Sequence, residues 1–420
     1  MIYAIDYGTS NSLLCAADSS GVTAPIALDS EALDPTILRS LLYFPHMNEV
    51  HYGARAIHEF VARDMQGRFI RSIKKYLPIK SFVGTFVDER PINLENIIGL
   101  FLGEMRRRAN LHFQADVDSV VLGRPARFSN DPEADAFAQY RLERAARLAG
   151  FKHIDFCPEP VAAAYSFRKQ LTSAKTVLVA DYGGGTSDYT VIRIGPNDFN
   201  ERDVLAIGGI SIAGDALDGA FMRGRISPYF GADVTYKVPF GSNVLKMPVG
   251  LIDKVCSPAD IVLLRGRDTL EFFRNVRTWS LGQHDKNKMD RLFALIEDQL
   301  GFDVFERIDQ VKRTLSNQNE AVFEFSYPTL EKIVDKVTRR DFETIIDGQI
   351  EQILTSLDET VLAAGLKHAD IDIVCCTGGT SKVPALHRAL ALRFGEDKLT
   401  SHGFFHSVVQ GLAEKALTLV

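Results

Sequence analysis

Hydrophobic positions along this 420-residue chain follow two periods. Runs of β-branched and other apolar residues predict strands, and apolar residues repeated every three or four positions predict helices. This mixture predicts an α/β fold with helices layered on sheets. The predicted strands are 2–6, 10–16, 118–123, 176–180, 188–194 and 371–376, and the predicted helices are 55–65, 94–109, 133–149, 159–170, 305–316, 340–364 and 383–394.

Two of the predicted strands end in similar short loops. The first strand runs into Asp6-Tyr7-Gly8, and the strand at 176–180 runs into Asp181-Tyr182-Gly183. No lysine follows the glycines as a Walker A loop requires, and the chain after Gly185 continues as a strand, whereas a dinucleotide-binding loop would open a helix. Each loop is therefore predicted to be a hairpin turn whose glycines allow φ > 0 and whose backbone N–H groups can approach an anion. For either loop alone, an ordinary surface hairpin is an equal alternative.

Each loop also carries an aspartate, and this carboxylate indicates which kind of anion the loops can bind. A carboxylate next to an anion-binding turn is unfavourable unless a cation lies between them, and Mg²⁺ bound by phosphate oxygens meets that need. We therefore predict that the two loops hold a magnesium-bound triphosphate between them. A third turn, Gly378-Gly379-Thr380-Ser381, precedes a helix expected to begin near Val383-Pro384, whose N-terminus can face a nucleotide. An ordinary Ser-capped helix start is the alternative for this turn.

Composition narrows the possible partners. The net charge of −6 and the isoelectric point near 6.0 argue against a general binder of nucleic acids or acidic membranes. No apolar run approaches the ~18–20 residues of a membrane span, and the N-terminus does not resemble a signal peptide. The five cysteines show no CxxC spacing and are expected to be reduced, mostly as core residues, while the ten histidines show no zinc-binding pattern. We expect a soluble, cytoplasmic protein without nucleic-acid or membrane partners.

The length of the chain exceeds one typical core and predicts two domains. Lobe I is expected to comprise residues 1–169 plus 403–420, with an inserted subdomain at about 31–113. Lobe II is expected to comprise residues 170–402, with an enlarged inserted subdomain at about 220–345. Within the latter, residues 225–300 show no strong periodicity before about residue 289 and contain the only tryptophan, Trp279.

Six motifs, taken in order, resemble the nucleotide-binding domain of the 70-kDa heat-shock chaperones, within the superfamily that includes actin and hexokinase. They are "IDYGTSNS", "VVLGRPARFSND", "FCPEPVAAAYSF", "VADYGGGTSDYTV", "ERIDQVKRTLSNQNEA" and "GGTSKVP". The fourth is close to the family's DLGGGTFD signature, and the fifth is very similar to its adenine-contacting helix. The resemblance implies a two-lobed, actin-like ATPase fold built from duplicated ribonuclease-H-like domains, with ATP in the cleft between the lobes.

The resemblance also implies roles for individual residues. Asp6 and Asp181 would face magnesium through water, and Asp188 would lie close by as a candidate ligand of a monovalent cation such as K⁺. Lys74 resembles the family's catalytic lysine and Glu159 its catalytic glutamate, with Asp181 and Thr186 completing the catalytic group. A solvated lysine and a helix N-terminal carboxylate are the alternatives for Lys74 and Glu159. The implied phosphate-binding residues are Gly8, Thr9, Ser10, Asn11, Gly183, Gly184, Gly185 and Thr186, and the implied adenosine-site residues are Gly214, Asp309, Lys312, Arg313, Ser316, Gly378, Gly379, Thr380 and Lys382.

The sequence departs from the family pattern at several positions. Asp309 stands where the chaperones have Glu, Lys382 where they have Arg, Pro158 where they have Asn, and Phe405 where they have Asp. These differences bear on nucleotide affinity and on coupling between the lobes. No interdomain linker, peptide-binding β-sandwich or lid follows Val420, so we expect a stand-alone ATPase domain.

The resulting expectation is a slow Mg-ATP hydrolase that acts as a conformational switch read by an unidentified protein client or regulator. One alternative is a small-molecule or sugar kinase of the same superfamily, which would need an acceptor site and an aspartate base. Others are an actin-like filament protein and a binding module that does not hydrolyse ATP.

Overall fold

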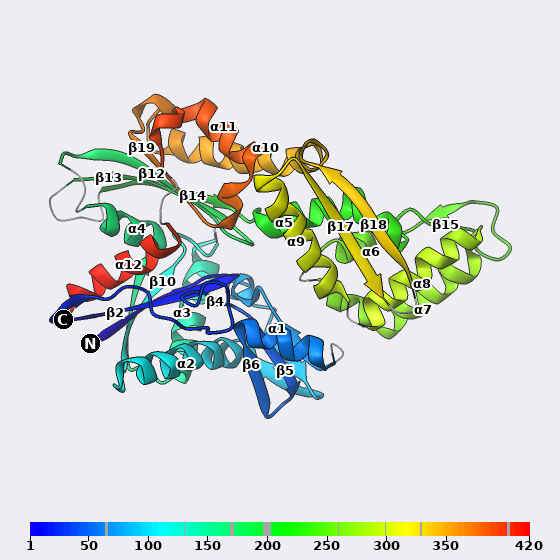
Figure 1. Cartoon of the computed structure of the whole chain (residues 1–420), viewed down its shortest axis with the longest axis horizontal. Helices are drawn as coiled ribbons and strands as arrows, with labels where there is room; N and C mark the ends of the chain where they lie inside the picture. Colours follow the sequence, from blue (N-terminus) through cyan, green and yellow to red (C-terminus); the bar gives the residue numbers. More distant parts are fainter. Residues whose placement is uncertain are drawn as a thin grey trace. The chain divides into compact units, whose positions relative to one another are not determined.

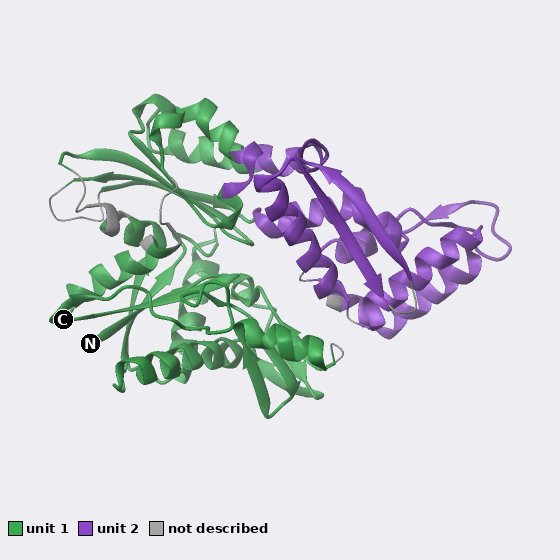
Figure 2. Cartoon of the chain, in the orientation of Figure 1, with its two compact units in different colours: residues 1–211, 353–381, 387–420 green, residues 212–352, 382–386 purple. Residues whose placement is uncertain are grey.

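The computed structural model describes residues 1–63, 66–129, 131–168, 172–195, 203–258, 260–298, 300–327, 330–400 and 404–420. The chain forms two compact units (Figure 2). Unit 1 comprises residues 1–211, 353–381 and 387–420, and unit 2 comprises residues 212–352 and 382–386. The lobe boundaries expected from the sequence, at 169/170 and 402/403, stay a prediction.

Unit 1 contains two large sheets (Figure 1), and the first is built around the N-terminal hairpin. Its strand order is β11-β10-β1-β2-β3, with β4 as a further short strand paired with β2. Strand β1 is antiparallel to β2 and parallel to β10, and β10 is parallel to β11. The strands are β1 (Ile2–Tyr7), β2 (Asn11–Asp18), β3 (Gly21–Val22), β4 (Leu38–Arg39), β10 (Ser119–Arg124) and β11 (His153–Pro158).

The second sheet repeats this plan. Its order is β14-β13-β12-β19-β20, with β12 antiparallel to β13 and parallel to β19. Hairpin β12–β13 therefore corresponds to hairpin β1–β2, and β19 corresponds to β10. This duplication confirms the expected fold, that of the actin-like ATPases. The strands are β12 (Lys175–Tyr182), β13 (Ser187–Ile194), β14 (Val204–Ile210), β19 (Ile373–Thr377) and β20 (Leu399–Thr400).

Two helices, α4 (Glu159–Arg168) and α12 (Phe404–Leu417), pack between the sheets. One buried cluster joins apolar side chains of both sheets, such as Val121 and Val179, to Ala162 of α4 and Leu412 of α12. The helices approach closely at Gly411, where a Cβ atom would overlap the carbonyl oxygen of Ala162. Phe405, a departure noted in the sequence, lies in α12, but its side chain is outside the described part.

The other face of the first sheet is covered by a larger core. Helices α2 (Leu94–Phe113) and α3 (Pro132–Leu148) bury residues such as Phe101 and Leu142 against strands β1 and β10. The remaining elements of residues 31–113 are β5 (Leu42–His46), β6 (Glu49–Tyr52), α1 (Gly53–Ala62), β7 (Arg68–Ile70), the 3₁₀ turn η1 (Ile73–Tyr76), β8 (Gly84–Val87) and β9 (Arg90–Asn93). The predicted helices 55–65 and 159–170 both run into residues outside the described part.

Unit 2 is built from helices and two hairpins. Its elements are α5 (Gly214–Phe221), a π-helical turn (Met222–Ile226), a 3₁₀ turn (Ser227–Phe230), β15 (Thr235–Tyr236), β16 (Leu245–Lys246), α6 (Val249–Val255), the 3₁₀ helix η5 (Ile261–Arg265), α7 (Arg267–Trp279), α8 (Gln283–Glu297), α9 (Gly301–Asn317), β17 (Glu320–Tyr327) and β18 (Leu330–Thr338). Within residues 225–300, whose sequence shows no strong periodicity before about residue 289, the Trp279 ring stacks on the Tyr236 ring with centroids 6.3 Å apart. Helices α10 (Arg339–Ala363) and α11 (Pro384–Phe394) each contribute residues to both units.

No helix in the described ranges is both long enough and apolar enough to cross a membrane. The five cysteines are free thiols and buried, as expected.

Candidate functional site

The two Asp-Tyr-Gly loops of unit 1 are closed by equivalent backbone hydrogen bonds. The expectation that their glycines adopt φ > 0 is wrong for Gly8, Gly183 and Gly185, none of which has a positive φ. In the first, the Gly8 amide donates to the Asn11 carbonyl at 3.0 Å, and in the second the Gly183 amide donates to the Thr186 carbonyl at 3.0 Å. A Cβ atom on Gly185 would lie 3.7 Å from the Thr9 methyl group. The two turns therefore lie next to each other, although they are far apart in the sequence.

The tips of both turns carry unused backbone donors. The amides of Thr9, Ser10, Gly184 and Gly185 donate to no acceptor that the structure describes. Clustered backbone N–H groups of this kind form anion-binding sites. The four residues are partly exposed, so an anion can reach them.

Hydroxyl groups hold the surrounding backbone and carboxylates in place. Ser40 donates to the Gly8 carbonyl at 2.8 Å, and Thr380 donates to the Gly183 carbonyl at 3.0 Å. Thr186 donates to Asp188 Oδ2 at 2.8 Å, and Thr377 donates to Asp181 Oδ1 at 2.5 Å. Sequence reasoning missed Ser40 and Thr377, because neither belongs to a glycine motif.

A buried ion pair lies beside the loops. Lys74, on the 3₁₀ turn η1, donates from Nζ to Glu159 Oε1 at 2.9 Å, and both residues are 8% exposed. Glu159 is the first residue of α4, and Gly123 leaves room for it, since a Cβ there would lie 3.3 Å from Glu159 Cγ. The alternative reading of Lys74 as a solvated side chain is excluded by its burial.

Negative charge exceeds positive charge in this region. Burial raises the pKa of Asp181 to about 6 and that of Asp188 to about 7, and the neighbouring Glu159 adds to both shifts. Burial also raises the pKa of Asp6 well above its usual range, with Glu159 and Asp181 as further causes. Burial lowers the pKa of Lys74, but Glu159, Asp6 and Asp188 more than offset this, so its pKa is raised. One lysine thus lies among four carboxyl groups.

The excess of carboxyl groups suits a divalent cation that keeps water molecules and phosphate oxygens as ligands. Among the residues described, no three His, Cys, Asp or Glu side chains converge closely enough to hold a metal ion directly. Mg²⁺ commonly keeps several waters and binds through one or two carboxylates and the phosphates of a substrate. Asp6, Asp181 and Asp188 are the residues that would face it.

The expected adenosine-site residues lie mostly in unit 2. Lys312 of α9 pairs with Asp218 of α5 at 2.8 Å and with Asp309 at 3.0 Å. Arg313 pairs with Asp309 at 2.8 Å. The Lys312 ammonium is therefore already bound by two carboxylates, and its pKa is raised by them despite burial. Burial in turn raises the pKa of Asp218 to about 6, with Lys312 opposing the shift.

Three other predicted residues, Ser316, Gly214 and Lys382, lie at or near the ends of helices and turns. Ser316 Oγ donates to the Lys312 carbonyl at 2.9 Å, and Gly214 is the buried first residue of α5. Lys382 ends the 3₁₀ turn that follows Gly378. Gly378 has φ +80°, and a Cβ there would overlap the Tyr182 carbonyl, so glycine is required at this position.

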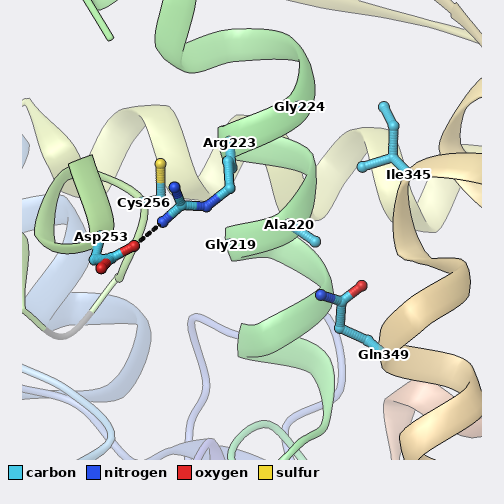
Figure 3. Close-up of a pocket in the computed structure, with 8 residues that line it drawn as sticks. All are labelled: Gly219, Ala220, Arg223, Gly224, Asp253, Cys256, Ile345 and Gln349. Atoms are coloured by element: carbon cyan, nitrogen blue, oxygen red, sulfur yellow. Dashed lines mark hydrogen bonds and ion pairs between the residues drawn. The ribbon is translucent and has the colours of Figure 1, made fainter. Parts of the chain in front are cut away.

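Unit 2 has a separate pocket of about 350 Å³ (Figure 3). Arg223 and Asp253 form an ion pair on one side, and Gln349 of α10 points in from the other. All its lining residues belong to unit 2, whereas the aspartates and glycine turns belong to unit 1.

Comparison with known proteins decides the family. The model of the Hsp70 protein family matches residues 51–220 and 296–416. The chain belongs to the Hsp70 family. The matched ranges fall in the nucleotide-binding region of Hsp70 proteins, and residues 221–295 of this Hsp70 chain lie outside them.

A curated relative agrees with this assignment. The chain is 24% identical to the "Chaperone protein HscA homolog" of Tolumonas auensis over 436 aligned positions. The alignment covers 99% of this Hsp70 chain and 57% of that relative, so the chain spans little more than half of the relative's length. The family model and this relative together support the Hsp70 assignment over most of the chain.

Proposed function

We propose that this Hsp70-family chain binds Mg-ATP at the paired glycine turns and hydrolyses it slowly, as a nucleotide-driven switch. The observation that carries the proposal is the set of four unused backbone amides at the tips of two adjacent turns, beside an excess of partly buried carboxyl groups. Phosphate oxygens satisfy the amides, and a divalent cation satisfies the carboxylates.

Each group of residues has a defined role in the reaction. The backbone amides of Thr9, Ser10, Gly184 and Gly185 bind phosphate oxygens. Magnesium, when bound, would supply positive charge that offsets the charge of the phosphates. Lys74, held by Glu159, supplies the positive charge of the protein itself, and such preorganised charge acts without reorganisation during the reaction.

We propose water as the acceptor. Glu159 accepts a hydrogen bond from Lys74, and Thr186 donates to Asp188. A kinase of this superfamily would need an acceptor pocket next to the phosphates. The pocket in unit 2 is lined by none of the proposed phosphate-binding or catalytic residues. The partner that reads the switch is proposed to be a protein, as for other chaperone ATPases.

Equilibrium binding tests the nucleotide site. We expect isothermal titration to show ATP and ADP binding that is at least about tenfold tighter with Mg²⁺ than with EDTA, because the uncompensated carboxylates repel free polyphosphate. Lys75→Met serves as a control, since Lys75 forms no ion pair among the described residues. Binding of ATP that is equally tight without a divalent cation would contradict the proposed role of the aspartates.

A further inference from the structure

The two halves of the site differ at one structurally equivalent position. In the second sheet, Asp181 of β12 is paired with Thr377 of β19. In the first sheet, β1 and β10 pair through Ile5 and Leu122, and the same register places Asp6 beside Gly123. The duplicated fold therefore puts a threonine next to one aspartate and a glycine next to the other.

This difference gives the two aspartates different surroundings. Thr377 is 3% exposed, and its hydroxyl donates to Asp181 Oδ1 at 2.5 Å. Asp6 has no such donor, and no described residue donates a hydrogen bond to its carboxylate. Gly123 instead leaves the space that Glu159 fills.

The strand register and the turn at Gly378 together fix the contact between Thr377 and Asp181. Paired residues of parallel neighbouring strands point to the same face of a sheet, so the two side chains are adjacent because of the register. The next residue, Gly378, turns away with φ +80°, and a Cβ on it would lie 3.0 Å from Asp181 Oδ1. The hydroxyl is the donor that the structure gives to this partly buried carboxylate.

We propose that Thr377 is a positioning residue that fixes Asp181, so that Oδ1 is held by the protein and Oδ2 is left to face the magnesium-bound nucleotide. The orientation of the Asp181 carboxylate is then fixed by the protein, whereas that of the Asp6 carboxylate can adjust. The inference rests on the proposed function, because it assigns Asp181 to the metal side of the site. Groups that orient metal-facing ligands in this way commonly contribute 10- to 100-fold to metal affinity.

The test is the Mg²⁺ concentration that gives half-maximal ATP binding, measured by titrating Mg²⁺ into protein with ATP. For Thr377→Val, which keeps the shape but removes the hydroxyl, we expect an increase of about tenfold or more. Thr377→Ser, which keeps the hydroxyl, should stay within about twofold of the wild type. If Thr377→Val does not fold, as judged by circular dichroism, Thr377→Ala replaces it.

The matched control is Thr190→Val on the neighbouring strand β13. Thr190 is 1% exposed and its hydroxyl has no partner among the described residues, so the same chemical change should leave the Mg²⁺ requirement unaltered. Wild-type Mg²⁺ dependence in Thr377→Val, or an equal shift in Thr190→Val, overturns the positioning role but leaves the proposed function standing. Absence of Mg²⁺-dependent ATP binding in the wild-type protein overturns both.

Discussion

Replacing Lys74 with methionine is expected to lower the single-turnover rate of ATP hydrolysis by about 10²- to 10³-fold while ATP still binds. Methionine keeps much of the length and apolar volume of the lysine stem but removes its charge. The backbone amides of both turns remain in place, so the phosphates keep most of their contacts. The measurement is quenched-flow analysis of ADP formation with enzyme in excess.

The same change should also reduce the stability of the nucleotide-free protein. Glu159 is 8% exposed and loses its only cationic partner among the described residues, and breaking a buried pair commonly costs about 3–5 kcal/mol. Lys74→Met combined with Glu159→Gln should recover much of that stability, because no unpaired charge is left, yet it should not recover hydrolysis.

The neighbouring lysine provides the control for this prediction. Lys75 lies with its ammonium 4.8 Å from the centre of the Tyr76 ring, and Lys75→Met should leave hydrolysis within about threefold of the wild type. A Lys74→Met protein that hydrolyses ATP at the wild-type rate would show that this lysine has a structural role only.

The second large effect concerns Gly411, in the middle of helix α12. Gly→Ala at an open position inside a helix usually stabilises a protein by about 0.5–1 kcal/mol. At Gly411 the new methyl group would overlap the Ala162 carbonyl of α4, so the two helices between the sheets would have to separate. We expect Gly411→Ala to destabilise the protein by about 3 kcal/mol, the upper part of the range for overpacking.

The matched variant is Gly348→Ala in helix α10. Gly348 is exposed, and a Cβ there would meet no atom within 4 Å, so this change should raise stability by up to about 1 kcal/mol. Both proteins are compared with the wild type by thermal and urea unfolding. Equal or higher stability of Gly411→Ala would show that α4 and α12 do not pack as closely as described.

Much of the fold could be predicted from the sequence where a local pattern carries the information. The strands of both hairpins and the helices around α2, α3, α9 and α10 lie close to the predicted ranges. Hairpin β17–β18 was not predicted, although its signal is present, since Ala321, Phe323 and Phe325 alternate with exposed residues. Helix α7 was not predicted either, although its buried residues Phe273 and Val276 are spaced three positions apart, as on one face of a helix.

The site was less predictable because its contacts join distant segments. The two Asp-Tyr-Gly loops and Lys74 were recognised from motifs, and the structure brings them together with Glu159 in unit 1. The bond between Thr377 and Asp181 joins residues 196 positions apart and depends on the register of β12 and β19. No local pattern sets that register. The assignment of Lys312, Arg313 and Lys382 to the adenosine stays a prediction.

Single-turnover hydrolysis of ATP by the wild-type protein, with Mg²⁺ and K⁺ and without any acceptor other than water, tests the central claim most directly. We expect slow, complete conversion of bound ATP to ADP and phosphate, and we expect EDTA to abolish it. Nucleotide-dependent light scattering in the same samples reports filament formation. If ATP stays intact until a small-molecule acceptor is added, the chain is a kinase; if it stays intact under all conditions, the site binds nucleotide without acting on it.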